Sequence, residues 1–155
     1  MLFFERFLSL MNALNARRVD YMVVGGVAMN MHGFARATED IDLFLAPDEA
    51  NVARLKLALQ DIWQDEDIAT ITAEDVLGDY PVLRYGPPED DVYIDIIFRL
   101  GEEVSYSDLD SQCLNVKGIE VKVATPKTLF DMKRNTLRAI DHEDARRLAA
   151  AFHFS

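Results

Sequence analysis

The sequence contains only one cysteine, Cys113, among its 155 residues. A single thiol excludes an internal disulfide framework and a zinc site built from cysteines. Cys113 lacks a convincing histidine or base context, so we expect a small buried residue rather than a nucleophile. The histidines His32, His142 and His153 are scattered as well, and none has a second histidine at metal-ligand spacing.

Long apolar runs are also missing from the chain. No stretch approaches the roughly 20 apolar residues that a membrane span requires. The N-terminus is apolar, but Glu5 and Arg6 interrupt it, and it lacks the basic start and small-residue cleavage site of a secretory signal. Together with the single cysteine, these absences predict a cytoplasmic protein that does not associate with membranes.

Positive charge is scarce, with 16 Lys and Arg against 27 Asp and Glu and a net charge of -11. Binding of nucleic-acid phosphates needs a cationic footprint, so extensive nucleic-acid binding is not expected, although a local basic patch is compatible with this balance. Half of the residues are apolar and 28% are charged, as in ordinary globular proteins. The length suits one domain with a hydrophobic core, and we expect residues 1–155 to form it.

Hydrophobic periodicity predicts alternating helices and strands. Helices are expected at about 2–18, 27–34, 47–63, 126–140 and 141–152, with Thr125 and Asp141 as caps and a short helix within the acidic segment 65–79. Strands are expected at 21–24, 41–45, 81–85, 92–98, 114–116 and 119–123. This order predicts an α/β (α+β) fold in which helices flank a mixed β-sheet.

The most informative feature is a pair of acids, Asp40 and Asp42, at the second predicted strand. Residues two apart on a strand point to the same face of the sheet. Two neighbouring carboxylates repel each other and lose solvation, so a cation is expected between them. A divalent metal that also holds a nucleotide phosphate meets this requirement.

A third acid, Asp95, interrupts a strand that is otherwise apolar. A charged residue there must be paired, bound to a ligand or placed at a cleft. A structural interpretation is the alternative: Asp40 caps a turn, Asp42 is a charge on an edge strand, and Asp95 pairs with an arginine such as Arg84.

Four residues around the Asp pair have the chemistry to bind phosphate. Gly25 and Gly26 lie between a strand and a helix, where a backbone without side chains can approach an anion, although a plain tight turn explains them too. Thr38 can donate its hydroxyl to a phosphate oxygen. Arg36 can neutralise phosphate charge or pair structurally with the acids, and the sequence favours neither role.

Gly-Gly, a spacer, Arg-x-Thr-x-Asp-Ile-Asp and a later strand aspartate resemble the nucleotidyltransferase superfamily of the DNA polymerase beta type. The arginine and threonine before the Asp pair resemble the AbiE-type toxin branch and its small uncharacterised relatives. The resemblance extends from about Tyr21 to Asp144. It implies that Asp40, Asp42 and Asp95 hold Mg²⁺ or Mn²⁺ and carry catalysis, while Gly25, Gly26, Arg36 and Thr38 bind the nucleotide.

The segment from Thr125 to Arg138 also resembles this superfamily. The resemblance implies that Lys133 reaches toward the triphosphate; a solvated helix lysine is the alternative. Arg138, Asp141 and Asp144 match a later motif, for which an ion-pair role at the helix junction and a catalytic role are both open.

The resemblance implies transfer of a nucleoside monophosphate from a nucleoside triphosphate to a hydroxyl acceptor, with pyrophosphate leaving. Relatives modify tRNA ends, protein hydroxyls or small antibiotics, and the acidic composition disfavours tRNA among these acceptors. Larger AbiE-type toxins carry an extra C-terminal region, so a partner protein or a second subunit is expected to supply acceptor binding. The resemblance also implies a role in a toxin–antitoxin system. The alternative is a non-catalytic nucleotide-binding or regulatory module that keeps the fold.

Overall fold

The computed structural model describes residues 2–77, 82–99 and 106–155. Within these ranges, the helices are α1 (Phe3–Ala16), α2 (Gly25–Met31), α3 (Glu49–Trp63), α4 (Glu66–Ala69), α5 (Ala73–Leu77), the 3-10 turn η1 (Tyr106–Asp108), α6 (Pro126–Lys133) and α7 (Ala139–Phe152). The strands are β1 (Tyr21–Val24), β2 (Asp40–Leu45), β3 (Val82–Tyr85), β4 (Tyr93–Ile97), β5 (Ser111–Val116) and β6 (Ile119–Ala124).

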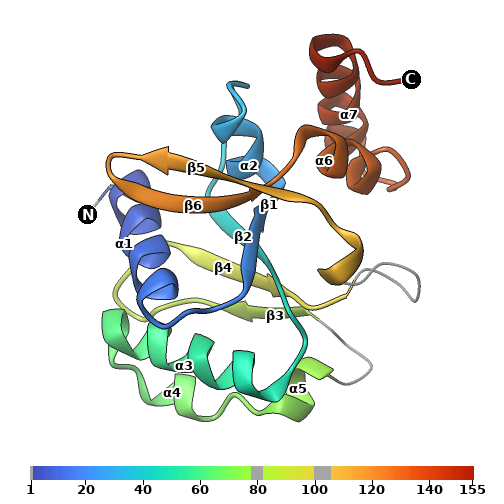
Figure 1. Cartoon of the computed structure of the whole chain (residues 1–155). Coiled ribbons are helices and arrows are strands. Elements are labelled where there is room, and N and C mark those ends of the chain that lie inside the picture. The colour runs from blue at the N-terminus through green and yellow to red at the C-terminus, as the bar shows by residue number, and fades with distance from the viewer. Residues whose placement is uncertain (1, 78–81, 100–105) are drawn as a thin grey trace.

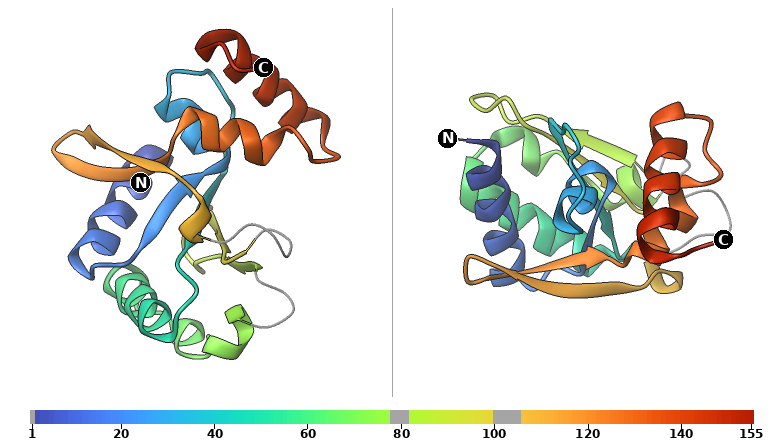
Figure 2. Two further views of the ribbon diagram at one scale, coloured as in Figure 1. Left: turned by 45° about the vertical axis from the view of Figure 1, so that its right-hand side comes forward. Right: turned by 90° about the horizontal axis from the view of Figure 1, so that it is seen from above.

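The strands form one mixed sheet in the order β3-β4-β2-β1-β6-β5. β2 pairs in parallel with β4, and β1 in parallel with β6, whereas the β1–β2, β3–β4 and β5–β6 pairs are antiparallel. Helices α1 and α3–α5 pack beside the sheet, and α6 and α7 form a separate hairpin at the other end of the molecule (Figures 1 and 2). The predicted class, a mixed sheet flanked by helices, is confirmed.

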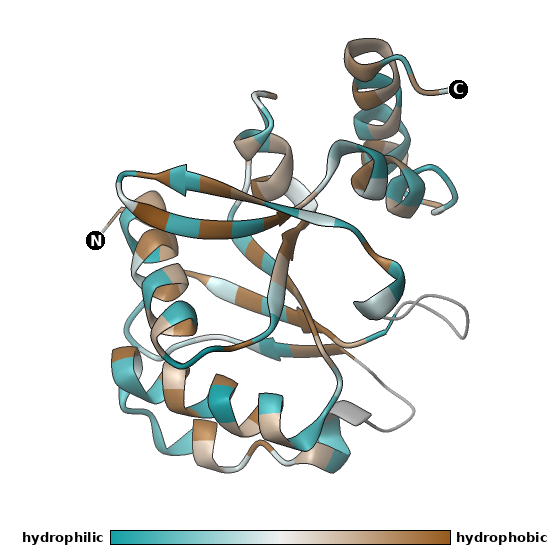
Figure 3. Cartoon of the chain, in the orientation of Figure 1, coloured by the Kyte–Doolittle hydropathy of each residue, from teal (hydrophilic) through white to brown (hydrophobic). Residues whose placement is uncertain are grey.

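The hydrophobic core lies between the sheet and its helices. In α1, Phe7, Leu10, Met11 and Leu14 are fully buried, as their helical spacing predicts. The central strands are buried almost throughout, while brown and teal residues alternate along β5 and β6 in Figure 3. Alternation indicates that β5 and β6 bury only one face. None of the helices in the described ranges is long and apolar enough to cross a membrane.

A buried asparagine, Asn51 of α3, fixes the two strands that lead to the site. Its amide nitrogen donates to the carbonyl oxygens of Asp20 (2.9 Å) and Ala46 (3.0 Å). Its side-chain oxygen accepts from the amide of Asp20 (2.8 Å). Asp20 precedes β1 and Ala46 follows β2, so this one side chain locks the antiparallel pair at the end away from Asp42.

Several predicted boundaries were wrong. The predicted helix at 27–34 begins at Gly25 and ends at Met31, and the segment 65–79 holds two short helices, with 78–79 outside the described residues. The helix predicted to reach residue 140 ends at Lys133, and Arg138 rather than Asp141 occupies the N-cap of α7. Asp141 lies inside α7. Its carboxylate accepts hydrogen bonds from Lys133 and Thr136 across the break between α6 and α7.

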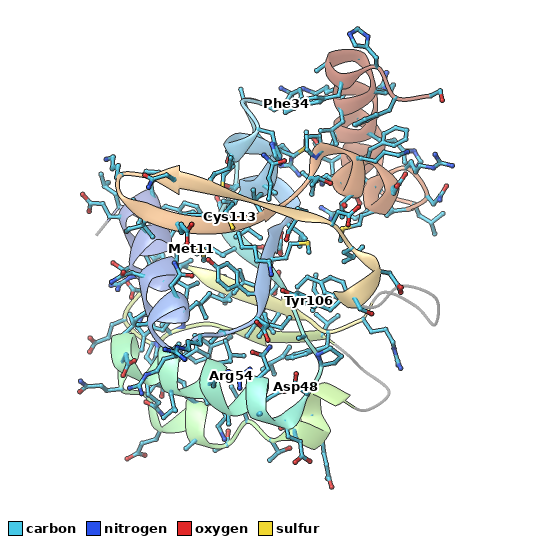
Figure 4. All side chains as sticks on the ribbon, viewed as in Figure 1. Met11, Phe34, Asp48, Arg54, Tyr106 and Cys113 are labelled. Carbon is cyan, nitrogen blue, oxygen red and sulfur yellow. The ribbon has the colours of Figure 1, made fainter. Side chains whose placement is uncertain are left out.

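The expectation of a buried Cys113 was also wrong. Cys113 is exposed on β5, the edge strand, where it is labelled in Figure 4. The periodicity of β5 leaves alternate side chains outside the core, and Cys113 falls on the outer set.

Candidate active site

A pocket of about 490 Å³ lies between the sheet and the α6–α7 hairpin. Its lining includes the eight residues for which catalysis, metal binding or nucleotide binding was expected, namely Gly25, Gly26, Arg36, Thr38, Asp40, Asp42, Asp95 and Lys133. Residues from α2, the loop before β2, β2, β4 and α6 therefore meet here, although Gly25 and Lys133 lie 108 positions apart in the chain. Arg138 and Asp141 also line the pocket.

Three carboxylates share one face of the sheet in this pocket. Asp42 of β2 lies directly opposite Asp95 of β4 in the parallel register. Asp40 is two residues from Asp42, so its side chain points to the same face. We call Asp40, Asp42 and Asp95 the carboxylate cluster.

The environment of Asp42 disfavours its charged form. Burial, the negative charges of Asp95 and Asp40, and a hydrogen bond with Asp95 together raise the pKa of Asp42 to about 6. Lys133 acts in the opposite direction and lowers that pKa. Among the described residues, no cation forms an ion pair with Asp42, which makes it the least compensated acid of the cluster.

Arg84 of β3 is the counter-ion of the other two acids. Its Nη2 lies 2.9 Å from Oδ2 of Asp40, and its Nε lies 2.8 Å from Oδ1 of Asp95. A second contact, 3.2 Å from Nη2 to Oδ2 of Asp95, makes the Asp95 pair bidentate. The antiparallel register sets Arg84 directly opposite Asp95, so Arg84, Asp95 and Asp42 form a row across three strands.

The two glycines allow a close approach of α2 to β2. A Cβ atom at Gly25 would lie 2.0 Å from Oδ2 of Asp42, and the backbone there has a φ of +70°, which favours glycine. A Cβ atom at Gly26 would lie 2.4 Å from the Cγ2 methyl of Thr38. Both positions therefore exclude side chains for reasons of packing, and Gly25 packs directly against the carboxylate cluster.

A second group of charges lies on the α6–α7 side of the pocket. Lys133 is 7% exposed, and its Nζ lies 3.0 Å from Oδ2 of Asp144 and 3.5 Å from Oδ1 of Asp141. Nε of Arg36 lies 3.3 Å from the same Asp144 oxygen. We call Arg36, Lys133, Asp141 and Asp144 the buried ionic cluster.

This cluster decides one alternative that the sequence left open and shows the partner of Arg36. Lys133 is buried, so the solvated helix lysine is excluded. Arg36 pairs with Asp144 and also lines the pocket. Asp144 is fully buried, and its Oδ1 has no hydrogen-bond partner among the described residues. Arg138 is mostly exposed and lies 3.9 Å from Asp141.

The carboxylate cluster has the donor chemistry for a hard divalent cation but is not arranged as a finished site. Carboxylate oxygens are the ligands that Mg²⁺ and Mn²⁺ prefer. Within the described ranges, however, no three His, Cys, Asp or Glu side chains are already placed to hold a metal ion. In this arrangement Arg84 forms ion pairs with Asp40 and Asp95. In donor chemistry alone, the three acids fit such an ion.

The sequence did not assign several of the residues that line the pocket. Ile97, Leu129 and Met132 give the pocket an apolar wall, and Arg84 was considered only as a structural partner of Asp95. The apolar residues carry no signal beyond their hydrophobicity. Arg84 could have been found by counting the register of the antiparallel pair 82–85 and 93–97.

Comparison with known proteins agrees with this geometry. The family described as "Nucleotidyl transferase AbiEii toxin, Type IV TA system" matches residues 6–148. No curated protein matches the sequence.

Three solved structures share the fold. ANT(2″)-Ia in complex with adenylyl-2″-tobramycin is 12% identical with a TM-score of 0.59, over 96% of this chain and 88% of that one. An antigenic nucleotidyltransferase-like protein from Paracoccidioides brasiliensis is 16% identical with a TM-score of 0.59, over 94% and 75%. A putative nucleotidyltransferase from Thermotoga maritima is 14% identical with a TM-score of 0.56, over 97% and 92%. At these identities, the similarity establishes the fold alone.

Proposed function

Because the chain belongs to the family of nucleotidyl transferase AbiEii toxins, we propose that it is a metal-dependent enzyme that transfers a nucleoside monophosphate from a nucleoside triphosphate to a hydroxyl acceptor. The observation that carries this proposal is the meeting of Asp40, Asp42 and Asp95 at one wall of the pocket. Such a concentration of negative charge is unfavourable without a cation, so it favours a site that works with one bound.

The three acids would hold Mg²⁺ or Mn²⁺. A bound metal ion would supply charge neutralisation on the triphosphate and orient it for in-line attack. In the reaction, the acceptor oxygen bonds to the α-phosphorus and the bond from that phosphorus to the pyrophosphate oxygen breaks. Pyrophosphate leaves with the bonding electrons, and the acceptor proton passes to the carboxylate of Asp95.

The triphosphate would lie across the mouth of the pocket near Gly25, Gly26, Thr38 and Arg36. Gly25 and Gly26 carry no side chains of their own, and they line the same pocket as Thr38 and Arg36. Lys133 would act on the phosphates mainly through its positive charge, because its ammonium group already contacts Asp141 and Asp144. The apolar residues Leu129 and Met132 offer a surface for the base or sugar.

The setting of this reaction is proposed from the family. The family description names a type IV toxin–antitoxin system, which implies an antitoxin partner. We further propose that residues 1–155 act as a single domain, that the protein works in the cytoplasm, and that a partner protein or a second copy contributes to binding of the acceptor.

One experiment tests the enzyme directly. The protein is incubated with each of the four α-³²P-labelled nucleoside triphosphates, Mg²⁺ and a cell extract, and the labelled product is identified after separation. We expect label transfer that requires Mg²⁺ and is lost in Asp42→Asn. Arg17→Gln, which breaks an exposed ion pair with Asp61 away from the pocket, is the matched control and should label normally.

A non-catalytic nucleotide-binding module is the second candidate, and a specific observation favours it. Arg84 already neutralises Asp40 and Asp95, as a structural ion pair would. The module predicts nucleotide binding without label transfer and without any effect of Mg²⁺. Absence of transfer with every triphosphate and every extract fraction, in a protein that binds nucleotide, would favour the module.

A further inference from the structure

Arg84 occupies the position at the carboxylate cluster where the proposed reaction needs a metal cation. Its guanidinium bridges Asp40 and Asp95 through three contacts of 2.9, 2.8 and 3.2 Å. These are two of the three acids assigned to the metal. A guanidinium remains charged at all accessible pH values, so its competition with a cation is permanent.

The position of Arg84 allows it to leave. It lies on β3, the outermost strand on its side of the sheet, and its side chain is 53% exposed. Its guanidinium carbon lies 4.7 Å from the centre of the Tyr93 ring, and Tyr93 is itself 47% exposed. A cation–π contact at an exposed site is weak, so it favours this position of the guanidinium without preventing its movement. An exposed ion pair is likewise a minor contribution to stability.

The cluster is not fully neutralised while Arg84 is bound. One guanidinium faces three acids, and Asp42 pairs with no cation among the described residues. A divalent ion carries twice the charge and can contact all three acids at once. Electrostatics therefore favours exchange of Arg84 for the metal whenever the metal is abundant.

We propose that Arg84 is a displaceable counter-ion: it neutralises Asp40 and Asp95 in the metal-free protein, lowers the affinity of the cluster for a metal, and turns outward when the metal binds. This inference rests on the proposed function, because it assumes that the carboxylate cluster is the metal site. Arg84 is thus a positioning residue: through Asp40 and Asp95 it determines the metal concentration at which the carboxylate cluster binds the ion.

The test measures Mn²⁺ binding by electron paramagnetic resonance, with no nucleotide and no acceptor present. Wild type is compared with Arg84→Gln, Arg84→Lys and Arg17→Gln. Arg17 is the matched control because its guanidinium makes an equally short bidentate pair, 2.7 Å to each oxygen of Asp61, and is 41% exposed. Thermal unfolding in EDTA checks that each variant is folded.

We expect Arg84→Gln to bind Mn²⁺ roughly tenfold more tightly than wild type, since one competing positive charge has been removed. Arg84→Lys keeps the charge but loses the bidentate geometry, so its affinity should lie between the two. Arg17→Gln should match wild type. Adding Asp42→Asn to Arg84→Gln should abolish the gain, which would locate the ion at the cluster.

Thermal unfolding gives a second readout. Arg84→Gln should melt below wild type in EDTA, because three acids then repel one another, and saturating Mn²⁺ should raise its melting temperature more than that of wild type. A purely structural arginine would also lower the melting temperature in EDTA but would give no larger rescue by Mn²⁺.

The outcomes separate this inference from the proposed function. Mn²⁺ binding in wild type that is unchanged or weaker in Arg84→Gln would overturn the role of Arg84 and leave the metal site in place. No Mn²⁺ binding in either protein would overturn both. Binding that appears only in Arg84→Gln, and is lost with Asp42→Asn, would support the displaceable counter-ion.

Discussion

The pocket is bordered by two groups of charges that are built in opposite ways. The carboxylate cluster has three acids and one basic partner, Arg84, which is more than half exposed. The buried ionic cluster has two acids and two basic partners, and three of its four residues are at most 8% exposed. One cluster is therefore left with excess negative charge near solvent, whereas the other is balanced in the interior.

This difference fits the proposed roles, a cation site for the carboxylate cluster and a structural connection for the buried ionic cluster. An unbalanced cluster of acids is stabilised when a cation binds. Without the cation, repulsion between the acids is expected to lower the stability of the folded protein. A balanced buried cluster is already satisfied, and removal of one member leaves a charge without a partner. The same substitution, from aspartate to asparagine, should therefore have opposite effects on the two sides of the pocket.

The largest effect is expected for Asp144→Asn. Asp144 is fully buried and accepts from both Lys133 and Arg36, so the variant leaves two cations facing a neutral amide. We expect the free energy of unfolding to fall by about 3–5 kcal/mol, measured by urea denaturation at pH 7.5 in EDTA.

Asp131→Asn is the control for Asp144→Asn. Asp131 pairs with Lys127 within α6, and both side chains are more than half exposed, so its loss should cost about 0.5 kcal/mol or less. Equal losses in the two variants would show that Asp144 is not the centre of a buried network and would remove the contrast between the clusters.

A smaller effect is expected for Gly25→Ala, which disturbs the carboxylate cluster through packing. The new Cβ would lie 2.0 Å from Oδ2 of Asp42, at a φ of +70°. We expect a loss of roughly 2–4 kcal/mol from backbone strain and overlap, together with weaker Mn²⁺ binding because Asp42 must move. Gly33→Ala isolates the strain, since Gly33 has a φ of +95° and no atom within 4 Å of an added Cβ. If Gly25→Ala is no more destabilising than Gly33→Ala, Asp42 is free to move.

Much of the fold and the membership of the carboxylate cluster could be predicted from the sequence. The strand at 21–24 has the bounds of β1, because four consecutive apolar residues end in two glycines. Each of Asp40, Asp42 and Asp95 falls at an apolar strand, where a charge needs an explanation, and the resemblance to nucleotidyltransferases grouped the three.

What the sequence could not give depends on contacts between distant elements. The break between α6 and α7 is one case: residues 134–138 leave the helix while Asp141 and Asp144 are drawn onto Lys133. Helical periodicity alone continued across this break, since a tertiary ion pair leaves no local signal. The partner of Arg36 was open for the same reason, because Asp144 is 108 positions away.

The smallest of the three effects is the pH dependence of Asp42→Asn, and it tests the unbalanced side of the comparison. The pKa of Asp42 is raised from 3.8 to about 6, mainly by burial and then by Asp95 and Asp40. The folded protein therefore binds more protons than the unfolded chain between about pH 4 and pH 6, and stability falls as the pH rises through this window. Asn cannot titrate, so this fall is absent from the variant.

We accordingly expect Asp42→Asn to gain stability relative to wild type as the pH rises from 4 to 7, by about 1–3 kcal/mol, and to gain no more above pH 7. The measurement is urea denaturation of both metal-free proteins in EDTA at pH 4.5, 6 and 7.5 and at constant ionic strength. Saturating Mg²⁺ with nucleotide should reverse the order at pH 7.5, because the ligand stabilises the wild type and binds the variant poorly. A structural ion pair at Asp42 predicts instead that the metal-free variant is less stable at pH 7.5 by about 3–5 kcal/mol. That result would show that Asp42 has a structural role like that of the buried ionic cluster, and it would contradict metal binding by the carboxylate cluster.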